Sequence, residues 1–450
     1  MPPTRRPSTR PDPDHGDAIV LEAPELLDGI GGEPALRVVD RLQRNGHEAY
    51  LVGGCVRDLL IGVTPKDFDV ATSARPRQVK NLFARNSFII GRRFKLVHVR
   101  YGADTVIETA TFRKKPDASE GDGDPLIVED NTYGSAEEDA RRRDFTVNGL
   151  LYDPHRGIVI DHVEGLDDLD DGVLRTIGDP YERIPEDPVR ILRAIKFATR
   201  LGFHVEDETW EAIRDSAPDL DRAAPPRILL EILRLLTSGT ALGAIQKLRQ
   251  CGALEVILPE LGEHLGPHDT TDPGDQKRTG RFMRQLEALD GYVHDGLEPT
   301  TALCVALLFH DIAERQLDPE TRTLPGAPPK ETQLVSEVLE RFVQHSRLAK
   351  SDAGRARRII IQQSRFLGPF GRRFRPLLFC LNPEFDEALD LFRIRCEARG
   401  EGWDIYKSWL ERRDEALGLT DDMIDEEKKK SRRGKRRRRS RSRKRGSGGS

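Results

Sequence analysis

Two carboxylates and two glycines lie close together in residues 51–71, and their types and spacing are suited to chemistry. Gly53 and Gly54 have no side chains, so the backbone there can approach a phosphate, and a helix after them would point its N-terminal amides at the same anion. On a strand, Asp67 and Asp69 would project from one face because side chains alternate with a period of two. The pair could therefore hold divalent metal ions beside a phosphate-binding turn.

The spacing of these aspartates is a weak signal alone, because surface carboxylates on an edge strand show it too. The context strengthens it: a strand, a Gly-Gly turn, a helix and a second strand supply amides for phosphates and carboxylates for two metals, as metal-dependent nucleotidyl transfer requires. Such sites usually need a third carboxylate from a neighbouring strand. Glu108 is the candidate because it lies in the segment TVIETAT, where an ionised side chain is costly unless it is paired or bound to metal. An ordinary outward-facing strand residue is the alternative.

The surrounding pattern predicts an α+β fold, in which a mixed sheet with helices is followed by a helical part. The sheet is expected to have about four or five strands up to residue 112, with a last strand after residue 157. Strands are expected within residues 48–52, 67–71, 88–90, 95–101, 105–112 and 158–161. Helices are expected at residues 33–45, 55–61, 76–84, 140–151, 188–201, 207–215, 226–237, 241–250, 282–292, 301–314 and 331–345, with a Gly/Pro/Asp-rich loop at 264–280.

The change to helical periodicity near residue 165 is the main predicted boundary. A proline-rich, aperiodic start and a basic end are both expected to be disordered. The resulting segments are a disordered N-terminal segment at 1–33, a sheet domain at 34–164, a first helical region at 165–238, a second at 239–415 and a basic tail at 416–450.

Composition limits the class of protein. With 450 residues, of which 37% are hydrophobic and 33% charged, the chain can bury a sizeable core in two or three domains. The longest apolar run, residues 302–309, is well short of the roughly 20 residues that span a bilayer, so no membrane helix is expected. The five cysteines are scattered without a CxxC pair, which is typical of a reducing cytoplasm and argues against structural zinc or disulfides.

The charge is distributed unevenly. Residues 428–445 contain 14 Lys or Arg and no acid; subtracting these 14 from the 72 basic residues leaves 58 against 76 acidic ones. Such a segment attracts polyanions and binds them less tightly as salt rises, so nucleic acid is the natural partner. A solvated tail that only aids solubility is the alternative.

Several motifs in residues 50–203 occur together in a defined order: LVGGCVRDLLIG, PKDFDVATSA, IETATFR, RRRDFTVNGLLYD and GDPYERIPEDPVRILRAIKFATRLGF. Together they resemble the class II nucleotidyltransferases, which comprise the bacterial poly(A) polymerases and the tRNA CCA-adding enzymes. The resemblance covers a third of the chain. It implies a nucleotidyltransferase palm, or head, at 34–164, then a helical neck at 165–238 for the base and RNA, and a helical RNA-binding body at 239–415.

The same motifs assign roles by position. The resemblance implies Asp67 and Asp69 as metal-binding catalytic residues and Glu108 as the third carboxylate, with Mg²⁺ in a two-metal site, Mn²⁺ as an alternative metal and ATP as substrate. Asp144 and Asn148 are four apart and are expected to share a helix face. The implied nucleotide-binding residues are Gly53, Gly54, Arg57 and Asp58 for phosphate, Arg143, Asp144 and Asn148 for ribose, and Asp187 and Arg190 for the base.

Asp187 and Arg190 also have a plainer interpretation. Asp187 directly precedes Pro188, which suits the first position of a helix, so it could be an N-cap with Arg190 exposed one turn later. A protein group that reads a base would use the same geometry, because Asp and Arg three apart present an acceptor beside a forked donor. Spacing alone leaves both open; the flanking motifs favour base recognition.

Residues 89–99, IIGRRFKLVHV, distinguish the two branches of the family. They resemble the GRRFxLxHV signature of bacterial poly(A) polymerases, whereas CCA-adding enzymes typically have a shorter segment with Gly-Thr; a basic β-turn is the alternative. Poly(A) polymerases of this type often end in an arginine-rich extension. Arg92, Arg93 and Arg436, Arg437, Arg438 and Arg439 are therefore predicted to contact RNA.

These observations favour a polynucleotide adenylyltransferase that adds AMP from ATP to RNA 3′ ends, in mRNA processing or decay. Lys196 departs from the family, which often has Arg there. The alternatives are a CCA-adding enzyme, an HD-type phosphohydrolase and a non-catalytic RNA-binding protein. The expected partners are RNA 3′ ends and ATP, without a membrane; the sequence leaves RNA-decay and RNA-chaperone proteins open.

His310-Asp311 resembles the HD pair of metal phosphohydrolases. A working site of that kind needs further His and Asp ligands from other helices, for which His294 is only a loose candidate. A polar pair at a helix end is the favoured interpretation. Cys55 is predicted to be a small helix residue rather than a nucleophile, because no neighbouring pattern activates it.

Overall fold

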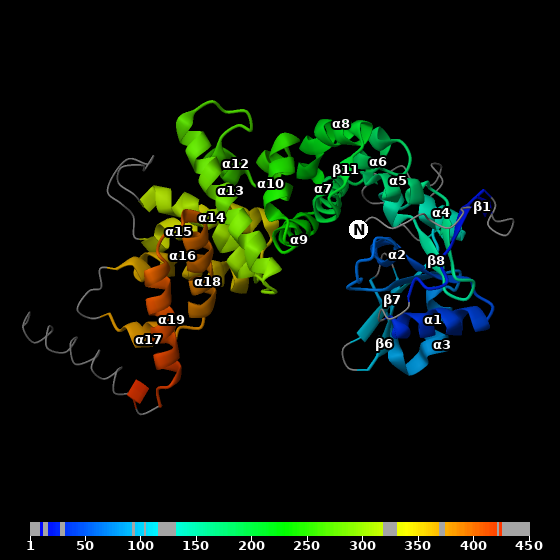
Figure 1. The fold of residues 1–450 in the computed structure, drawn as a ribbon, viewed down its shortest axis with the longest axis horizontal. Coiled ribbons are helices and arrows are strands. Elements are labelled where there is room, and N and C mark those ends of the chain that lie inside the picture. Colours follow the sequence, from blue (N-terminus) through cyan, green and yellow to red (C-terminus); the bar gives the residue numbers. More distant parts are fainter. Residues whose placement is uncertain are drawn as a thin grey trace, which may run out of the picture. The chain divides into compact units, whose positions relative to one another are not determined.

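The computed structural model describes residues 10–11, 17–27, 32–91, 95–102, 105–115, 132–317, 331–368, 374–420 and 423–424. The chain forms two compact units, Met1–Asp219 and Leu220–Ser450, and each is described by itself (Figure 1). The first unit contains the main sheet and the second is built from helices. The predicted α+β class is confirmed.

The main sheet of the first unit has nine strands among the described residues, in the order β1-β2-β9-β8-β3-β4-β7-β6-β5. The neighbours β4 and β7 are parallel and the other pairs are antiparallel, so the sheet is mixed as predicted. The strands are Arg10–Pro11 (β1), Ile19–Glu22 (β2), Ala49–Val52 (β3), Asp69–Thr72 (β4), Ser87–Ile90 (β5), Leu96–Tyr101 (β6), Thr105–Thr111 (β7), Leu151–Asp153 (β8) and Ile158–Asp161 (β9).

The expectation of four or five strands was wrong because short strands escape periodicity. Residues 19–22 were assigned to a disordered segment, yet they pair with β9 and bury Val20 and Leu21. Residue 151 was assigned to the end of a helix and residues 152–153 to no element, yet together they form the strand β8 between β3 and β9. A strand of three or four residues contains too few alternations to be distinguished from a loop.

Helices α1 and α3 contact one face of the sheet, as Figure 1 shows beside β6 and β7. Val97, Val99 and Ile107 are buried on that face, whereas the alternate residues Arg100 and Val106 are exposed on the other. The helices of this unit are Glu33–Arg44 (α1), Gly54–Leu60 (α2), Pro76–Phe83 (α3), Ala136–Arg141 (α4), Gly165–Asp171 (α5), Pro180–Glu186 (α6), Val189–Leu201 (α7) and Asp207–Ser216 (α8). A small parallel sheet joins Val173–Leu174 (β10) to His204–Val205 (β11).

The face opposite α1 and α3 is divided into two halves. On the half that leads from β3 to β9, Val52, Leu151 and Ile160 are buried in one core cluster with Ala136 of α4. These residues continue the row that begins at Asp69, because Asp69 pairs with Val52, Val52 with Leu151, and Leu151 with Ile160. Asp69 therefore lies at the border between a half of this face that is covered by the core cluster and a half whose side chains are exposed.

The second unit packs its helices around an aromatic core. Trp409 is completely buried against Phe366 and Phe379 and donates its indole N–H to the carbonyl of Phe366 at 3.2 Å. The helices are Pro225–Leu236 (α9), Ala241–Gln250 (α10), Ala253–Ile257 (α11), Pro259–Leu265 (α12), Pro273–His294 (α13), Thr301–Leu317 (α14), Glu331–Ser346 (α15), Lys350–Leu367 (α16), Pro376–Cys380 (α17), Phe385–Arg399 (α18) and Trp403–Leu417 (α19).

The predicted loop at residues 264–280 is largely helical, because α13 begins nine residues earlier than expected, at Pro273. Its start carries a clear signal: Asp272 accepts a hydrogen bond from the amide of Asp275 at 2.9 Å, and Pro273 follows it. The first turns have few apolar side chains, so periodicity did not reveal them. Among the described residues, no helix combines the length and apolar character needed to cross a bilayer.

Candidate active site

Asp69 begins β4 and lies directly opposite Glu108 of the parallel neighbour β7. Directly paired residues of neighbouring strands project to the same side, so the two carboxylates share one face. Glu108 extends this row to His98 of β6, whose Nε2 lies 3.3 Å from Glu108 Oε1. The neighbouring-strand position predicted for Glu108 is thus the one observed, and its role in binding metal stays a prediction.

Asp67 lies in the loop before β4 rather than on the strand. The prediction of a strand from residue 67 was wrong because β3 ends at Val52, which pairs with Asp69. After Val52 the backbone turns at Gly53 into α2. The loop residues before Asp69 therefore have no neighbouring strand to pair with. The loop, and not strand alternation, therefore places the exposed carboxylate of Asp67.

The pKa of the Asp69 carboxyl is raised from 3.8 to about 6. Loss of hydration against the surrounding chain is the largest cause, although part of the residue remains exposed, and the negative charge of Glu108 is the next. Arg143 opposes the rise, and Asp67 adds to it. The local balance of charge is therefore negative, and a bound cation would relieve it.

The turn between β3 and α2 needs glycine at its first position. Gly53 has φ 76° and ψ −133°, which a residue with a Cβ rarely adopts, and a Cβ there would lie 2.8 Å from a terminal nitrogen of Arg143. Gly54 is different, because its Cβ would make only an ordinary 3.5 Å contact with Arg57. Of the two glycines, Gly53 is the one that the close approach requires.

Arg143 brings a positive charge to the same place. Its NH2 donates to Asp139 Oδ2 at 3.2 Å and its NH1 to the carbonyl of Asn148 at 3.5 Å. Among the described residues, its buried Nε has no hydrogen-bond partner. A cation held between the Gly53 turn and Asp69 is placed to meet phosphate oxygens.

Arg57 and Asp58 lie inside the domain, although they were predicted to bind nucleotide. Arg57 is 1% exposed and donates to Asp58 Oδ1 at 2.9 and 2.5 Å, while its NH1 donates to Asn148 Oδ1 at 2.5 Å. Its guanidinium also stacks 5.0 Å above the ring of Phe197. These side chains bind protein groups and hold α2 in place behind the turn.

Asp144 and Asn148 meet, but not on a helix. The predicted helix at 140–151 was wrong: α4 ends at Arg141, and residues 146–148 form a single 3₁₀ turn before β8. Asp144 Oδ1 accepts hydrogen bonds from the amide of Phe145 at 3.0 Å and from Asn148 Nδ2 at 3.1 Å. This side chain competes with helical backbone bonds, which explains the break.

Two arginines of α7 that sequence reasoning missed complete the network. Arg193 Nε donates to Asp144 Oδ2 at 2.7 Å, and Arg200 NH2 donates to Asp58 Oδ2 at 2.8 Å. Burial alone would raise the pKa of Asp144, but Arg193 lowers it below its usual range. The two arginines are seven apart, so they share a helix face, and that spacing was the available signal.

Asp187 and Arg190 lie at the junction of α6 and α7. Asp187 follows the last residue of α6, Pro188 occupies the N-cap of α7 without a side-chain bond, and Arg190 is largely buried with 14% of its side chain exposed. The plain N-cap with an exposed Arg190 is therefore wrong. Burial first, and then Arg183, lowers the pKa of Arg190.

Glu186 connects this junction to the sheet domain. Its carboxylate lies 2.5 Å from Lys115 Nζ, 2.5 Å from Arg183 NH1 and 3.4 Å from Arg190 NH1. Burial alone would raise the pKa of Glu186, but Lys115 and Arg183 lower it. Sequence reasoning did not single out Glu186, although it is the first letter of the EDPVR motif.

The residues predicted to contact RNA cannot be placed. Arg92 and Arg93, and Arg436, Arg437, Arg438 and Arg439, lie outside the described residues. Their contact with RNA stays a prediction from the sequence. Cys55 is buried, and burial raises the pKa of its thiol to about 11, as expected of a structural residue and not of a nucleophile.

His310 and Asp311 are buried in the interior of α14, not at a helix end as predicted. With Glu314 they form a group whose possible ligand atoms all lie within 4.8 Å of one another. Glu314, however, accepts from Arg395 at 2.8 Å and from Arg399 at 2.7 Å. Arg281 Nε also lies 3.1 Å from Asp311 Oδ2, and Gln285 Nε2 donates to Asp311 Oδ1 at 3.0 Å. Cations and an amide from other helices therefore make the group part of a buried polar network.

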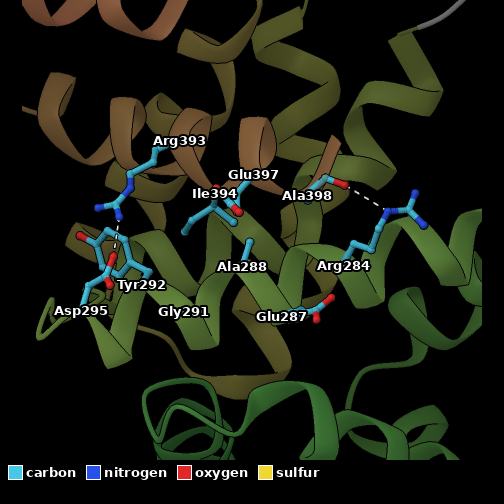
Figure 2. A pocket seen from close by; sticks show the side chains of 10 residues that line it. All are labelled: Arg284, Glu287, Ala288, Gly291, Tyr292, Asp295, Arg393, Ile394, Glu397 and Ala398. Atoms are coloured by element: carbon cyan, nitrogen blue, oxygen red, sulfur yellow. Dashed lines mark hydrogen bonds and ion pairs between the residues drawn. The ribbon is translucent and has the colours of Figure 1, made fainter. Parts of the chain in front are cut away.

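A cavity of about 470 Å³ lies between α13 and α18 of the second unit (Figure 2). Its arginines are engaged with protein groups: Arg393 pairs with Asp295 at 2.6 Å, and Arg284 donates to the carbonyl of Ala398 at 3.0 Å. Small residues such as Gly291 leave the space open. The cavity lacks the carboxylate row and the glycine turn of the first unit.

The mixed sheet, its carboxylates and the adjoining glycine turn are the features of a nucleotidyltransferase head within the first unit. The family described as "Poly A polymerase head domain" matches residues 49–175. The descriptions "Probable RNA and SrmB- binding site of polymerase A" and "Polymerase A arginine-rich C-terminus" match residues 202–265 and 330–445. The chain belongs to the family of bacterial poly(A) polymerases and CCA-adding enzymes.

Relatives from both branches are similar to the chain. Poly(A) polymerase I of Haemophilus influenzae is 36% identical, over 84% of this chain and 83% of that protein. A CCA-adding enzyme of Geobacillus thermodenitrificans is 37% identical, over 51% of this chain and 55% of that protein. The crystal structure of the Bacillus stearothermophilus CCA-adding enzyme in complex with CTP has a TM-score of 0.59 at 24% identity, covering 85% of this chain and 82% of that one, which shows the shared fold.

Proposed function

We propose that this chain is a template-independent polynucleotide adenylyltransferase, which joins AMP from ATP to RNA 3′ ends. The observation that carries the proposal is the site on the interior strands β4 and β7, where Asp69 and Glu108 lie side by side next to the Gly53 turn and Arg143. Membership of the family supports it. The head, neck and body at 34–164, 165–238 and 239–415 would divide catalysis, base recognition and RNA binding among them.

The carboxylates fit divalent metal. Mg²⁺ and Mn²⁺ prefer oxygen ligands, and Asp69 and Glu108 offer carboxylate oxygens on one face of neighbouring strands. Burial first, and then the negative charge of Glu108, raises the pKa of Asp69, and a bound cation would oppose that rise. Asp67 and Asp69 would hold the metals, with Glu108 beside them. When bound, two such ions activate the attacking hydroxyl and stabilise the leaving pyrophosphate.

The remaining residues would bind and orient the nucleotide. The backbone at Gly53 and the guanidinium of Arg143 would hold the triphosphate. Asp144 would meet the ribose, and the buried Asn148, whose Nδ2 donates to Asp144 at 3.1 Å, would fix its orientation. Arg57 and Asp58 would act through the turn as positioning residues. Asp187 and Arg190 would hydrogen-bond the base, and Glu186 would fix the orientation of Arg190.

CCA addition is the second candidate, because a CCA-adding relative matches half of the chain and a CCA-adding enzyme shares its fold. The GRRF segment, the arginine-rich end and the longer match to a poly(A) polymerase favour AMP addition. Incubation of the purified protein with each nucleotide separately, on an oligoadenylate and on a tRNA that lacks CCA, distinguishes the two. Long tails from ATP alone support the proposal, and strict stopping after CCA overturns it.

The site itself is tested with Asp69→Ala. We expect the rate of AMP addition to fall by about 1,000-fold or more, because the variant loses a ligand that acts in the transition state. Asp207→Ala is the matched control, since this carboxylate of α8 is 97% exposed in its side chain. Equal rates for the Asp69 variant and the parent would refute the assignment.

A further inference from the structure

The open half of the catalytic face carries an unusual set of exposed side chains. Phe88 and Ile90 of the edge strand β5 are 38% and 41% exposed, and Val106 of β7 is 39% exposed. Arg100 of β6 is also exposed on this face, where it pairs with Val106, and His98 lies two residues before it on the same strand, opposite Glu108. Phe88, Ile90, His98, Arg100 and Val106 are called the β5–β7 platform below.

The platform is continuous with the carboxylates. Phe88 pairs with His98, His98 with Glu108, and Glu108 with Asp69, so these four residues form one row on one face. Three strand spacings of about 4.8 Å separate Phe88 from Asp69, or about 14 Å. Bases stack at about 3.4 Å, so the distance corresponds to roughly four stacked bases.

The contacts within the platform are those of a stacking surface with a positive edge. The rings of Phe88 and His98 have centroids 5.7 Å apart, and the guanidinium of Arg100 lies 5.6 Å from the Phe88 ring centroid. Proteins bind single-stranded nucleic acid by combining aromatic rings, on which bases stack, with cations that meet the phosphates. An aliphatic surface alone would lack the cations that meet the phosphates.

The path that a bound RNA strand can follow away from Asp69 is also restricted by the buried half of this face. On the other side of Asp69, the row continues into Val52 and Leu151, which are buried in the core cluster. A strand whose end reaches the carboxylates along this face therefore has its open path over β7, β6 and β5.

We infer that the β5–β7 platform binds the last nucleotides of the RNA 3′ end, with a base stacked on Phe88 and a phosphate bound by Arg100. The inference rests on the proposed function, because RNA must deliver its 3′-hydroxyl to the carboxylates. It adds a binding site for the acceptor strand within the head, separate from the basic C-terminal tail.

The test measures the affinity for RNA, and the KM values for RNA and for ATP separately, with the full-length protein. The probe is a single-stranded oligoadenylate with a fluorescent adenine analogue at its 3′ end, titrated without ATP, followed by steady-state addition of AMP to the same RNA. Phe88→Ala is expected to weaken RNA binding and raise the KM for RNA by about 5-fold to 100-fold, with the KM for ATP unchanged. Arg100→Ala is expected to lower the salt dependence of binding by about one unit of slope.

Matched controls separate contact from folding. Ile89→Ala changes an equally exposed residue of the same strand, 38% exposed, that projects from the opposite face, and Arg77→Ala removes an exposed cation from α3. Both controls should bind RNA as the parent does, and Phe88→Trp should restore stacking. Equal RNA affinity for the parent and Phe88→Ala overturns the inference and leaves the platform as a surface for protein. A loss of RNA affinity in Ile89→Ala as large as that in Phe88→Ala also overturns it.

The two proposals fail in different ways. If the parent binds the RNA through Phe88 but adds CCA or nothing, the platform stands and the proposed function fails. If the parent adds long tails and Phe88→Ala has an unchanged KM for RNA, the function stands and the platform fails.

Discussion

Asp69 shows the conflict between stability and chemistry in one residue. Its folded pKa of about 6 lies above the ordinary 3.8, so the folded protein holds this proton more tightly than the unfolded chain does. The folded state therefore loses stability as pH rises from about 4 to 6, where Asp69 ionises beside Glu108 and Asp67. If Asp69 holds metal as proposed, the protein retains this cost when metal is absent.

Asp69→Asn should therefore stabilise the metal-free protein while it abolishes AMP addition. Because the carboxylate is partly exposed, solvent screens most of the effect, and we expect a rise in Tm of about 1–3 °C at pH 7.5 that disappears below pH 4. Thermal unfolding in a chelator measures it, with Asp207→Asn as control. Mg²⁺ should raise the Tm of the parent but not of Asp69→Asn; a lower Tm for the variant at pH 7.5 would contradict the electrostatic account.

Residue types predicted which residues lie together around Asp69 better than spacing did. Asp69, Glu108 and Gly53 could be selected because a carboxylate on an apolar strand and a glycine at a turn are each costly without a purpose. Arg57 looked equivalent to a ligand in sequence, yet it is 1% exposed and bound to protein. An arginine that binds phosphate and one that supports the turn differ only in burial, which the sequence does not encode locally.

At the scale of elements, the strand–turn–helix unit from β3 to α2 was predictable because it is local. Its strand, glycines and helix follow one another in 12 residues, Ala49–Leu60. The segment around Asp144 was not predictable. Its apolar spacing suits a helix. However, the side chain of Asp144 accepts hydrogen bonds from the backbone amide of Phe145, from Nδ2 of Asn148 and from Arg193 of α7.

The β3–α2 turn yields a prediction that separates strain from function. Gly53→Ala should lower stability by about 2–3 kcal/mol and AMP addition at least about tenfold, because it strains the backbone and displaces Arg143. Gly62→Ala, at the end of the same helix, has a similar φ of 74° but open space around its Cβ. It should lower stability by about 1 kcal/mol and leave activity intact.

Chemical denaturation and steady-state rates on the two glycine variants decide the matter. Equal losses of activity in Gly53→Ala and Gly62→Ala would mean that the turn needs only its backbone conformation. A loss of activity in Gly53→Ala but not in Gly62→Ala, seen mainly as a higher KM for ATP, would support the role of the contact with Arg143.

At the scale of the whole molecule, the chain separates an acidic folded part from a basic end. The sequence predicted this division and the α+β class from composition and periodicity, both of which average over many residues. It did not predict α13 to its full length or the buried network around Asp311. Those features depend on partners far along the chain, such as Arg281 and Arg395, whose proximity no local pattern reports.

The basic end should control RNA affinity and processivity rather than the chemical step. Deletion of residues 428–450 removes 14 cations, so the slope of log affinity against log salt should fall, by at most about 10 units if every cation met a phosphate. The KM for RNA should rise and tails should shorten at physiological salt, while the rate of the first AMP addition at saturating RNA stays the same. Deletion of 446–450 alone, GSGGS, is the uncharged control. Because the platform and the carboxylates remain in the truncated chain, a lost chemical step at saturating RNA would contradict this division of labour, and an unchanged salt slope would reduce the tail to a solubility segment.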